Sequence, residues 1–88
     1  MIYVDSPKWK KPNGRKYYAH MVADTLDELH RFAEMIGVKR HFFHRGDKPH
    51  YDVTDQQYLT AIENSAVEVT SREIVRLSKL LGESHAAE

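Results

Sequence analysis

The first third of the chain carries two strand-like patterns followed by one strong helical pattern. Residues 1–5 and 17–22 alternate in the way expected of half-buried strands. Apolar residues then recur at helical spacing from Leu26 to Ile36, and Gly37 follows them. The pattern predicts two strands and a helix that ends near Gly37.

Helix starts are marked at three places. Thr25 and Thr70 are each followed three residues later by Glu, which is the pattern of a capping box. Between them, Thr54 or Asp55 is expected to begin a further helix. Apolar spacing after Thr70 predicts a last helix, and Gly82 is expected to end it.

The remaining pattern adds two short strands and leaves one segment open. Residues 50–53 and 67–70 are expected to be strands. Residues 38–44 alternate loosely and fit either a strand or a turn of helix. Prolines and an Asn-Gly pair predict a loop over residues 6–16, and the sequence RGDKP predicts a turn.

The order of these elements predicts an α/β or α+β fold, with a single small mixed β-sheet and about three helices. The 88 residues leave no room for a second core. We expect residues 1–82 to form one globular domain and residues 83–88 a frayed tail. A chain of this size buries little more than about 60% of its unfolded surface, so a homodimer or a bound ligand would add stability.

Composition excludes several kinds of site. Without cysteine there is no disulfide or thiolate chemistry, and any metal must be held by His, Asp or Glu. No apolar run approaches a membrane span and no signal-peptide pattern opens the chain, which indicates a cytoplasmic protein without a membrane segment. The HExxH, P-loop and GxSxG motifs are also absent from the sequence.

Charge is balanced overall but unevenly distributed. The net charge of zero argues against nucleic-acid binding by the whole surface. Lys and Arg nevertheless exceed Asp and Glu before residue 53 and are outnumbered after it. A small anionic ligand or nucleotide, or with weaker support a nucleic acid, should therefore meet the first half. Trp9 and Arg15 in the basic loop are candidate ligand-binding residues, and Arg40 beside Phe42 and Phe43 suits a phosphate, although either Phe alone fits the core.

Histidine and aspartate form the most specific candidate site. Five of the six histidines lie within residues 20–54. His20 and Asp24 bracket a strand end and a helix start, and His50 and Asp52 project from one face of a strand. We expect His20, His50 and Asp52 to hold zinc, manganese or iron(II), and Asp24 and Arg40 to complete a catalytic set. Alternatively, Asp24 only caps a helix and His20 is a partly buried strand residue, while His50 and Asp52 lie on a solvated strand edge.

The sequence HMVADTLDELHRFAEMIG followed by HYDVT resembles a family of small bacterial and phage proteins catalogued as domain of unknown function 4031, over roughly residues 1–75. Two positions depart from that family: Ser65-Ala66 replaces a common Gly-Ala, and His44 replaces a frequent Gln. His44 is therefore not counted among the expected site residues. The resemblance implies no activity, but it implies that His20, Asp24, His50 and Asp52 act together. The family pattern corresponds here to Asp5, His20, Asp24, Glu28, His30, Arg40, Phe43, His50, Tyr51 and Asp52.

Two functional hypotheses follow, and they leave open whether the protein is an enzyme. The first is a domain that binds or acts on a phosphate-containing or nucleotide-type ligand, assisted by a metal. The alternative is a non-catalytic binding module that grips a host protein or nucleic acid. An enzyme should gather the His and Asp residues in one cleft, whereas a module should scatter them and expose an aromatic patch. A third reading makes them a structural hydrogen-bond network.

Overall fold

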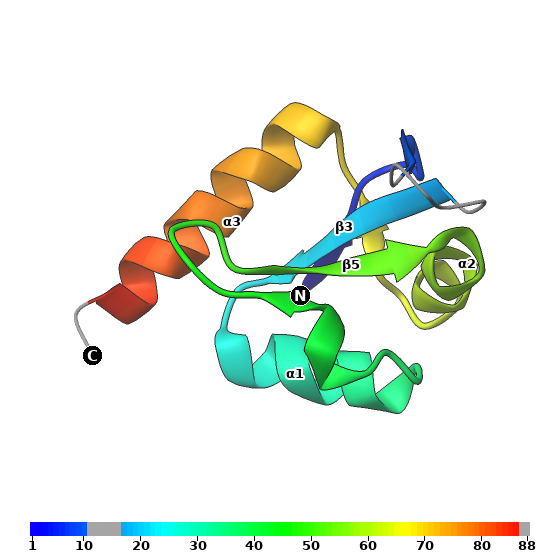
Figure 1. The fold of residues 1–88 in the computed structure, drawn as a ribbon, viewed down its shortest axis with the longest axis horizontal. Coiled ribbons are helices and arrows are strands. Elements are labelled where there is room, and N and C mark those ends of the chain that lie inside the picture. The colour runs from blue at the N-terminus through cyan, green and yellow to red at the C-terminus, as the bar shows by residue number, and fades with distance from the viewer. Residues whose placement is uncertain (11–16, 87–88) are drawn as a thin grey trace.

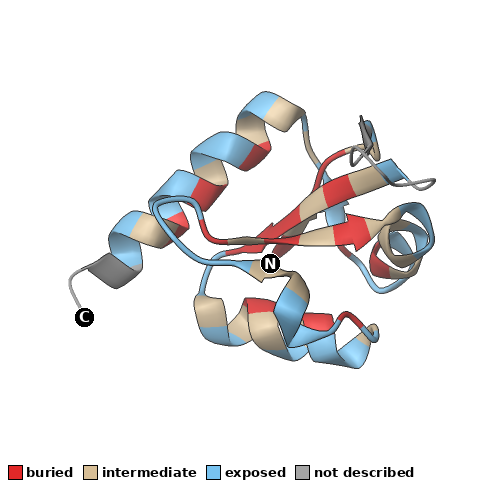
Figure 2. Cartoon of the chain, viewed as in Figure 1, coloured by how far each residue is buried: buried red, intermediate tan, exposed pale blue. Residues whose placement is uncertain are grey.

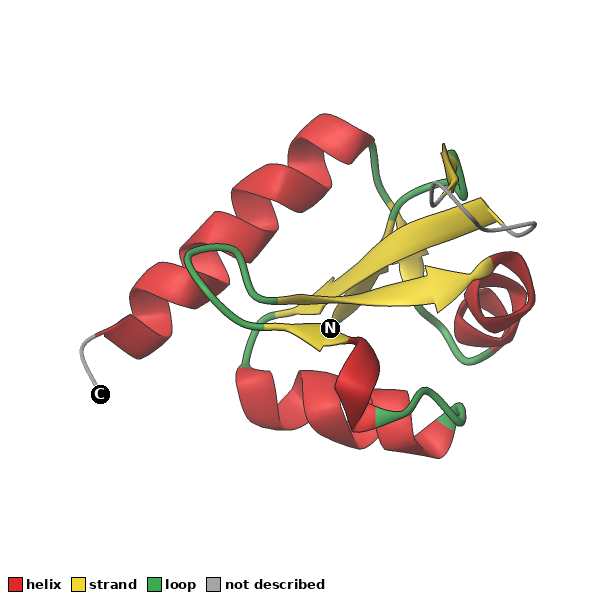
Figure 3. Ribbon diagram, viewed as in Figure 1, coloured by secondary structure: helices red, strands yellow, loops and turns green. Residues whose placement is uncertain are grey.

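The computed structural model describes residues 1–10 and 17–86 and has an α+β fold (Figure 1). One mixed β-sheet is flanked by α1 on one side and by α3 on the other (Figure 3). Helix α2 lies beside the end of β5. This arrangement confirms the predicted fold class of a single small mixed sheet with three helices.

The sheet has five strands in the order β4-β5-β3-β1-β6, and a further short strand, β2, also pairs with β3. Strand β1 runs antiparallel to β3 and parallel to β6, while β5 runs antiparallel to both β3 and β4. The strands are β1 (Ile2–Val4), β2 (Trp9–Lys10), β3 (Tyr17–Ala23), β4 (Phe43–His44), β5 (His50–Thr54) and β6 (Val67–Glu68).

The two faces of the sheet carry different kinds of side chain. Tyr51 of β5 lies on the face covered by α1, because its hydroxyl is hydrogen-bonded to His30 of that helix at 2.8 Å. Successive strand residues point to opposite faces, so His50 and Asp52 point toward the side of α3. The register places His20 of β3 directly opposite Asp52. The candidate site therefore lies on the face away from α1.

The core is built from the central strands and the inner sides of the helices (Figure 2). Leu29 and Ala33 of α1 are buried, as the helical spacing predicted. Burial of apolar side chains contributes roughly 25 cal/mol per Å² and is the main stabilising term for a sheet covered by helices. The largest fully buried apolar side chains are Val4, Met21, Val22, Leu29, Tyr51 and Val53.

The helices begin where the capping residues predicted. Thr25 accepts a hydrogen bond from the backbone N–H of Glu28 at 3.2 Å, and Thr70 accepts one from Glu73 at 3.1 Å. Thr54 forms a complete capping box with Gln57. The helical segments are α1 (Leu26–Met35), the 3-10 helix η1 (Arg40–Phe42), α2 (Asp55–Glu63) and α3 (Ser71–Ala86).

The predicted end of the last helix at Gly82 is wrong. Helix α3 continues to Ala86, so residues 83–86, expected in a frayed tail, are helical, and residues 87–88 lie outside the described part of the chain. A Cβ atom added at Gly82 would stand 2.2 Å from the backbone oxygen of Asp47. The glycine therefore allows close packing against the turn before β5, a long-range contact that local sequence does not reveal.

Three other segments differ in detail from the sequence pattern. The predicted loop over residues 6–16 contains β2, and residues 11–16 lie outside the described part of the chain. The predicted strand over residues 67–70 is shorter, since β6 ends at Glu68. Residues 38–44, left open between strand and helix, contain both η1 and β4.

None of the helices within the described residues is long and apolar enough to cross a membrane.

Candidate metal centre

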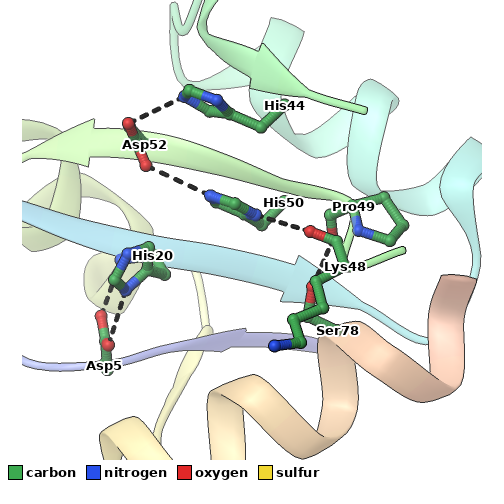
Figure 4. Close-up of polar contacts among 8 residues, drawn as sticks. All are labelled: Asp5, His20, His44, Lys48, Pro49, His50, Asp52 and Ser78. Carbon is green, nitrogen blue, oxygen red and sulfur yellow. Dashed lines mark hydrogen bonds and ion pairs between the residues drawn. The ribbon is translucent and has the colours of Figure 1, made fainter. Parts of the chain in front are cut away.

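Asp5, which directly follows β1, and His20 of β3 are held together by polar contacts of both backbone and side chains. The His20 backbone N–H donates to Asp5 Oδ1 at 2.6 Å, and the His20 ring Nδ1 lies 2.9 Å from Asp5 Oδ2 (Figure 4). The Asp5 backbone N–H in turn donates to the His20 carbonyl at 3.2 Å. Because a carboxylate only accepts hydrogen bonds, this contact assigns a proton to His20 Nδ1 and directs Nε2 away from Asp5.

The buried Asp5 carboxyl is held in its charged form. Its exposed fraction is 0%. Burial alone would raise its pKa, but hydrogen bonds from the His20 ring and backbone, together with the His20 charge, hold the pKa below the usual value. A carboxylate in this position fixes the orientation of a histidine ring, as carboxylates commonly do behind metal-ligating histidines.

His50 is oriented by a different acceptor. Its Nδ1 lies 2.7 Å from the backbone oxygen of Lys48, and since a carbonyl only accepts, Nδ1 carries the proton. Its Nε2 therefore faces Asp52 Oδ1, at 3.5 Å (Figure 4). Burial lowers the pKa of His50, but the Asp52 and Lys48 hydrogen bonds and the charges of Asp52 and Asp5 raise it more, so the net shift is upward.

His44 completes the cluster from β4. Its Nε2 lies 2.9 Å from the second oxygen of Asp52, and its ring stacks on His50 with centroids 4.9 Å apart. The His20 ring meets the edge of His50 with a centroid distance of 5.2 Å. Three histidines and two carboxylates thus form one continuous polar cluster. Its members come from β3, β4, β5 and the residue after β1, and they are Asp5, His20, His44, His50 and Asp52.

Three of these side chains have the spacing of a metal site. One ligand atom each from His20, His50 and Asp52 lies within 4.8 Å of the others. Metal–ligand bonds of about 2.0–2.2 Å in tetrahedral geometry put neighbouring ligand atoms about 3.4 Å apart. The 3.5 Å between His50 Nε2 and Asp52 Oδ1 already matches that spacing, so metal binding would mainly require His20 to approach.

Two other predicted catalytic residues lie outside the cluster. Asp24 is exposed, and its carboxylate accepts from the Met1 amino group at 3.1 Å and from the Tyr3 hydroxyl at 3.0 Å. Arg40 lies in η1 and lines a cavity with Tyr51, on the face covered by α1. The structure therefore brings His20, His50 and Asp52 together and leaves Asp24 and Arg40 elsewhere.

The two predicted ligand-binding residues of the basic loop have different outcomes. Trp9 lies in β2, where its backbone is paired opposite Tyr18 of β3. Arg15 lies outside the residues that the structure describes. Their roles stay predictions.

Sequence reasoning missed two members of the cluster. Asp5 follows an apolar strand, and a carboxylate directly after a buried strand was the available signal. His44 was set aside because it departs from the family pattern, yet it bonds Asp52 directly. Its two-residue strand is too short for its facing direction to be predicted from alternation.

Comparison with known proteins places the chain in one family. The model of the family described as "Protein of unknown function (DUF4031)" matches residues 2–80, nearly the whole chain. The same comparison found no curated protein and no solved structure that matches this chain. The match covers every member of the polar cluster.

Proposed function

This chain belongs to the DUF4031 family, and we propose that it binds a divalent metal through His20, His50 and Asp52. The metal would serve to bind or act on a phosphate-containing or nucleotide-type ligand. One observation carries the proposal: three ligand atoms converge within 4.8 Å. The Nδ1 contacts of both histidines direct their Nε2 atoms as metal ligation requires.

The ligand set suggests which metals would bind. Two imidazoles and one carboxylate, without a thiolate, suit zinc, manganese or iron(II) better than magnesium, which prefers oxygen ligands. Three protein ligands leave at least one position for water or a phosphate oxygen, which is the arrangement of catalytic rather than structural zinc sites. A divalent ion facing one ligating carboxylate also keeps a positive charge, and that charge favours an anionic ligand.

His44 gives the proposed centre a candidate acid or base. It bonds Asp52 at 2.9 Å and its side chain is 50% exposed, so it reaches solvent while contacting a ligand residue. An imidazole beside a metal-bound ligand is a common general acid or base. This role does not require His44 to bind the metal.

Metal analysis tests the proposal. The untagged protein, equilibrated with zinc or manganese and freed of excess ion, should retain about one equivalent. His50→Ala and Asp52→Ala should lose it because each removes a ligand. His41→Ala is the matched control, since His41 is exposed and contacts Phe42 instead of the cluster. Circular dichroism would confirm that each variant is folded.

The result also decides between the two functional hypotheses. Retained metal that depends on His50 and Asp52 would justify a screen of phosphate monoesters and nucleotides for binding and hydrolysis. Equal metal content in His50→Ala and His41→Ala, or no metal in the unaltered protein, would reject the metal centre. Metal-free acid–base chemistry and the non-catalytic binding module would then both stay open, and a search for macromolecular partners would be the next step.

A further inference from the structure

A second polar site lies on the opposite face of the sheet. A cavity of about 450 Å³ opens between α1, the segment 37–40 and β5. Its lining includes His30, Glu34, Lys39, Arg40 and Tyr51. This volume is within the range of small-molecule sites, and the cavity shares no lining residue with the polar cluster.

The cavity has a fixed hydrogen-bonding pair in its wall. The Tyr51 side chain is 1% exposed, and its hydroxyl lies 2.8 Å from His30 Nδ1. Burial raises the pKa of Tyr51, so the hydroxyl keeps its proton. Since His30 Nδ1 is its hydrogen-bond partner among the described residues, we assign the hydroxyl as the donor and Nδ1 as the acceptor. The remaining proton of a neutral His30 is then on Nε2, where it is a hydrogen-bond donor.

The charges around His30 are mostly positive. Burial and the charges of Arg40 and Arg45 lower its pKa, against a smaller opposing effect of Asp27, and so favour the neutral ring. Across the described residues, neither arginine forms an ion pair with a carboxylate. Lys39 and Arg40 are the two cations of the cavity lining, against the single carboxylate of Glu34. Arg40, which pairs with no carboxylate among the residues that the structure describes, lies beside the His30 imidazole and is suited to bind an anion.

A neighbouring cavity extends this site. It has a volume of about 590 Å³ and is also lined by His30. The rest of its lining includes apolar side chains (Leu26, Phe43 and Pro49) and charged ones (Arg45, Asp47, Lys79 and Glu83). Its apolar side chains offer space for an organic group on the far side of His30. An anion at Arg40 could therefore carry an aromatic or aliphatic substituent into this second space.

We propose that the cavity formed by α1, segment 37–40 and Tyr51 binds the phosphate group of a small phosphate monoester, with Arg40 and Lys39 as charged partners and His30 as a neutral donor. Arginine presents a planar pair of N–H groups that matches two phosphate oxygens. The site needs no metal, and it does not depend on the function proposed for the polar cluster.

A titration with phosphate in the presence of EDTA tests this proposal without the metal centre. Inorganic phosphate, added to the full-length ¹⁵N-labelled protein, should shift backbone amide signals of residues 37–40 and 51. Phosphate should also raise the pKa of His30, because a nearby anion favours the imidazolium. Phenyl phosphate should bind more tightly than inorganic phosphate, because its ring has the neighbouring cavity to occupy.

Matched variants assign the contact. Arg40→Gln should weaken phosphate binding about ten-fold or more, since a charge-assisted hydrogen bond is lost. Arg31→Gln is the control, because Arg31 lies on α1, is 80% exposed and pairs with Asp27. His50→Ala should bind phosphate as the unaltered protein does. Equal affinity of Arg40→Gln and Arg31→Gln, shifts confined to residues 20, 50 and 52, or no shift at all would overturn the proposal.

Discussion

His50 and His30 lie on opposite faces of one small sheet and have opposite surroundings. His50 faces Asp52, and the net effect of its neighbours is to raise its pKa. His30 is surrounded by Arg40 and Arg45, and burial together with these charges lowers its pKa. Two histidines of one small domain therefore have surroundings that suit different ligands. The negative charge beside His50 favours a cation, and the positive charge beside His30 favours an anion.

Strand alternation separates the two environments. His50 and Tyr51 are adjacent in β5, yet one joins the polar cluster and the other bonds His30 across the sheet. Met21 and Val53, both fully buried, lie on the same face of the sheet as Tyr51. Substitutions on one face should therefore leave the other face largely unchanged.

Asp5→Ala should have the largest effect on stability. It removes a fully buried carboxylate and leaves the His20 backbone N–H and ring Nδ1 without their acceptor. We expect a loss of about 3 kcal/mol in the free energy of unfolding, measured by urea denaturation. Asp47→Ala, at an exposed aspartate, is the control and should change stability by less than about 0.5 kcal/mol. Similar values for the two variants would show that the Asp5–His20 contacts contribute little.

Tyr51→Phe should have a moderate effect confined to the face covered by α1. The ring still fills the core, but His30 Nδ1 loses its donor. The expected cost is about 1 kcal/mol, typical of one buried hydrogen bond. Urea denaturation would measure that cost, and metal binding by the variant should be unaltered. A loss of metal in Tyr51→Phe would contradict the independence of the two faces.

Stability should depend on pH in opposite ways at the two histidines. The raised pKa of His50 contributes stability below its unfolded value of 6.5, which is lost as pH rises through the folded pKa. The lowered pKa of His30 contributes stability above 6.5, which is lost as pH falls through its folded pKa. His50→Gln should therefore cost more near pH 5 than near pH 8.5, and His30→Gln the reverse. Urea midpoints at both pH values would check this, and the same pH trend in both variants would contradict it.

Charge substitutions should shift the pKa of each histidine separately. Their effect on the free energy of unfolding should be the smallest of the effects predicted here. Asp52→Asn should lower the pKa of His50, because it removes an acceptor and a negative charge. Arg40→Gln should raise the pKa of His30, because it removes a nearby positive charge. Ring-proton titration by NMR would follow both histidines in each variant. A change in the pKa of His30 in Asp52→Asn would contradict the independence of the two faces.

Local sequence predicted the parts of this molecule that depend on neighbouring residues. Capping residues marked the starts of the helices, and period-two alternation put His50 and Asp52 on one face. The register that sets His20 opposite Asp52 was not predictable in this way, because it depends on how β3 and β5 align. It was the His and Asp pattern as a whole that suggested these three residues act together.

Long-range contacts account for the rest. Asp24 was expected in the site, but the Met1 amino group and the Tyr3 hydroxyl hold its carboxylate elsewhere. Strands β1 and β2 pair with successive parts of β3, and residues 6–8 separate the two pairings. Asp5 lies at the start of this interruption, where its side chain accepts a hydrogen bond from the His20 backbone. Gly82 allows α3 to meet the turn at Asp47 instead of ending the helix. Each of these contacts joins residues more than ten positions apart.

The most direct test of the metal centre is a long-range ¹H–¹⁵N correlation of the histidine rings during a zinc titration. At one equivalent of zinc, the Nε2 signals of His20 and His50 should move as coordinated nitrogens. Their Nδ1 atoms should stay protonated, because Asp5 and the Lys48 carbonyl accept from them. The signals of His30 should stay unchanged. Zinc that first shifts His30 or His41, or shifts no ring at one equivalent, would contradict the account.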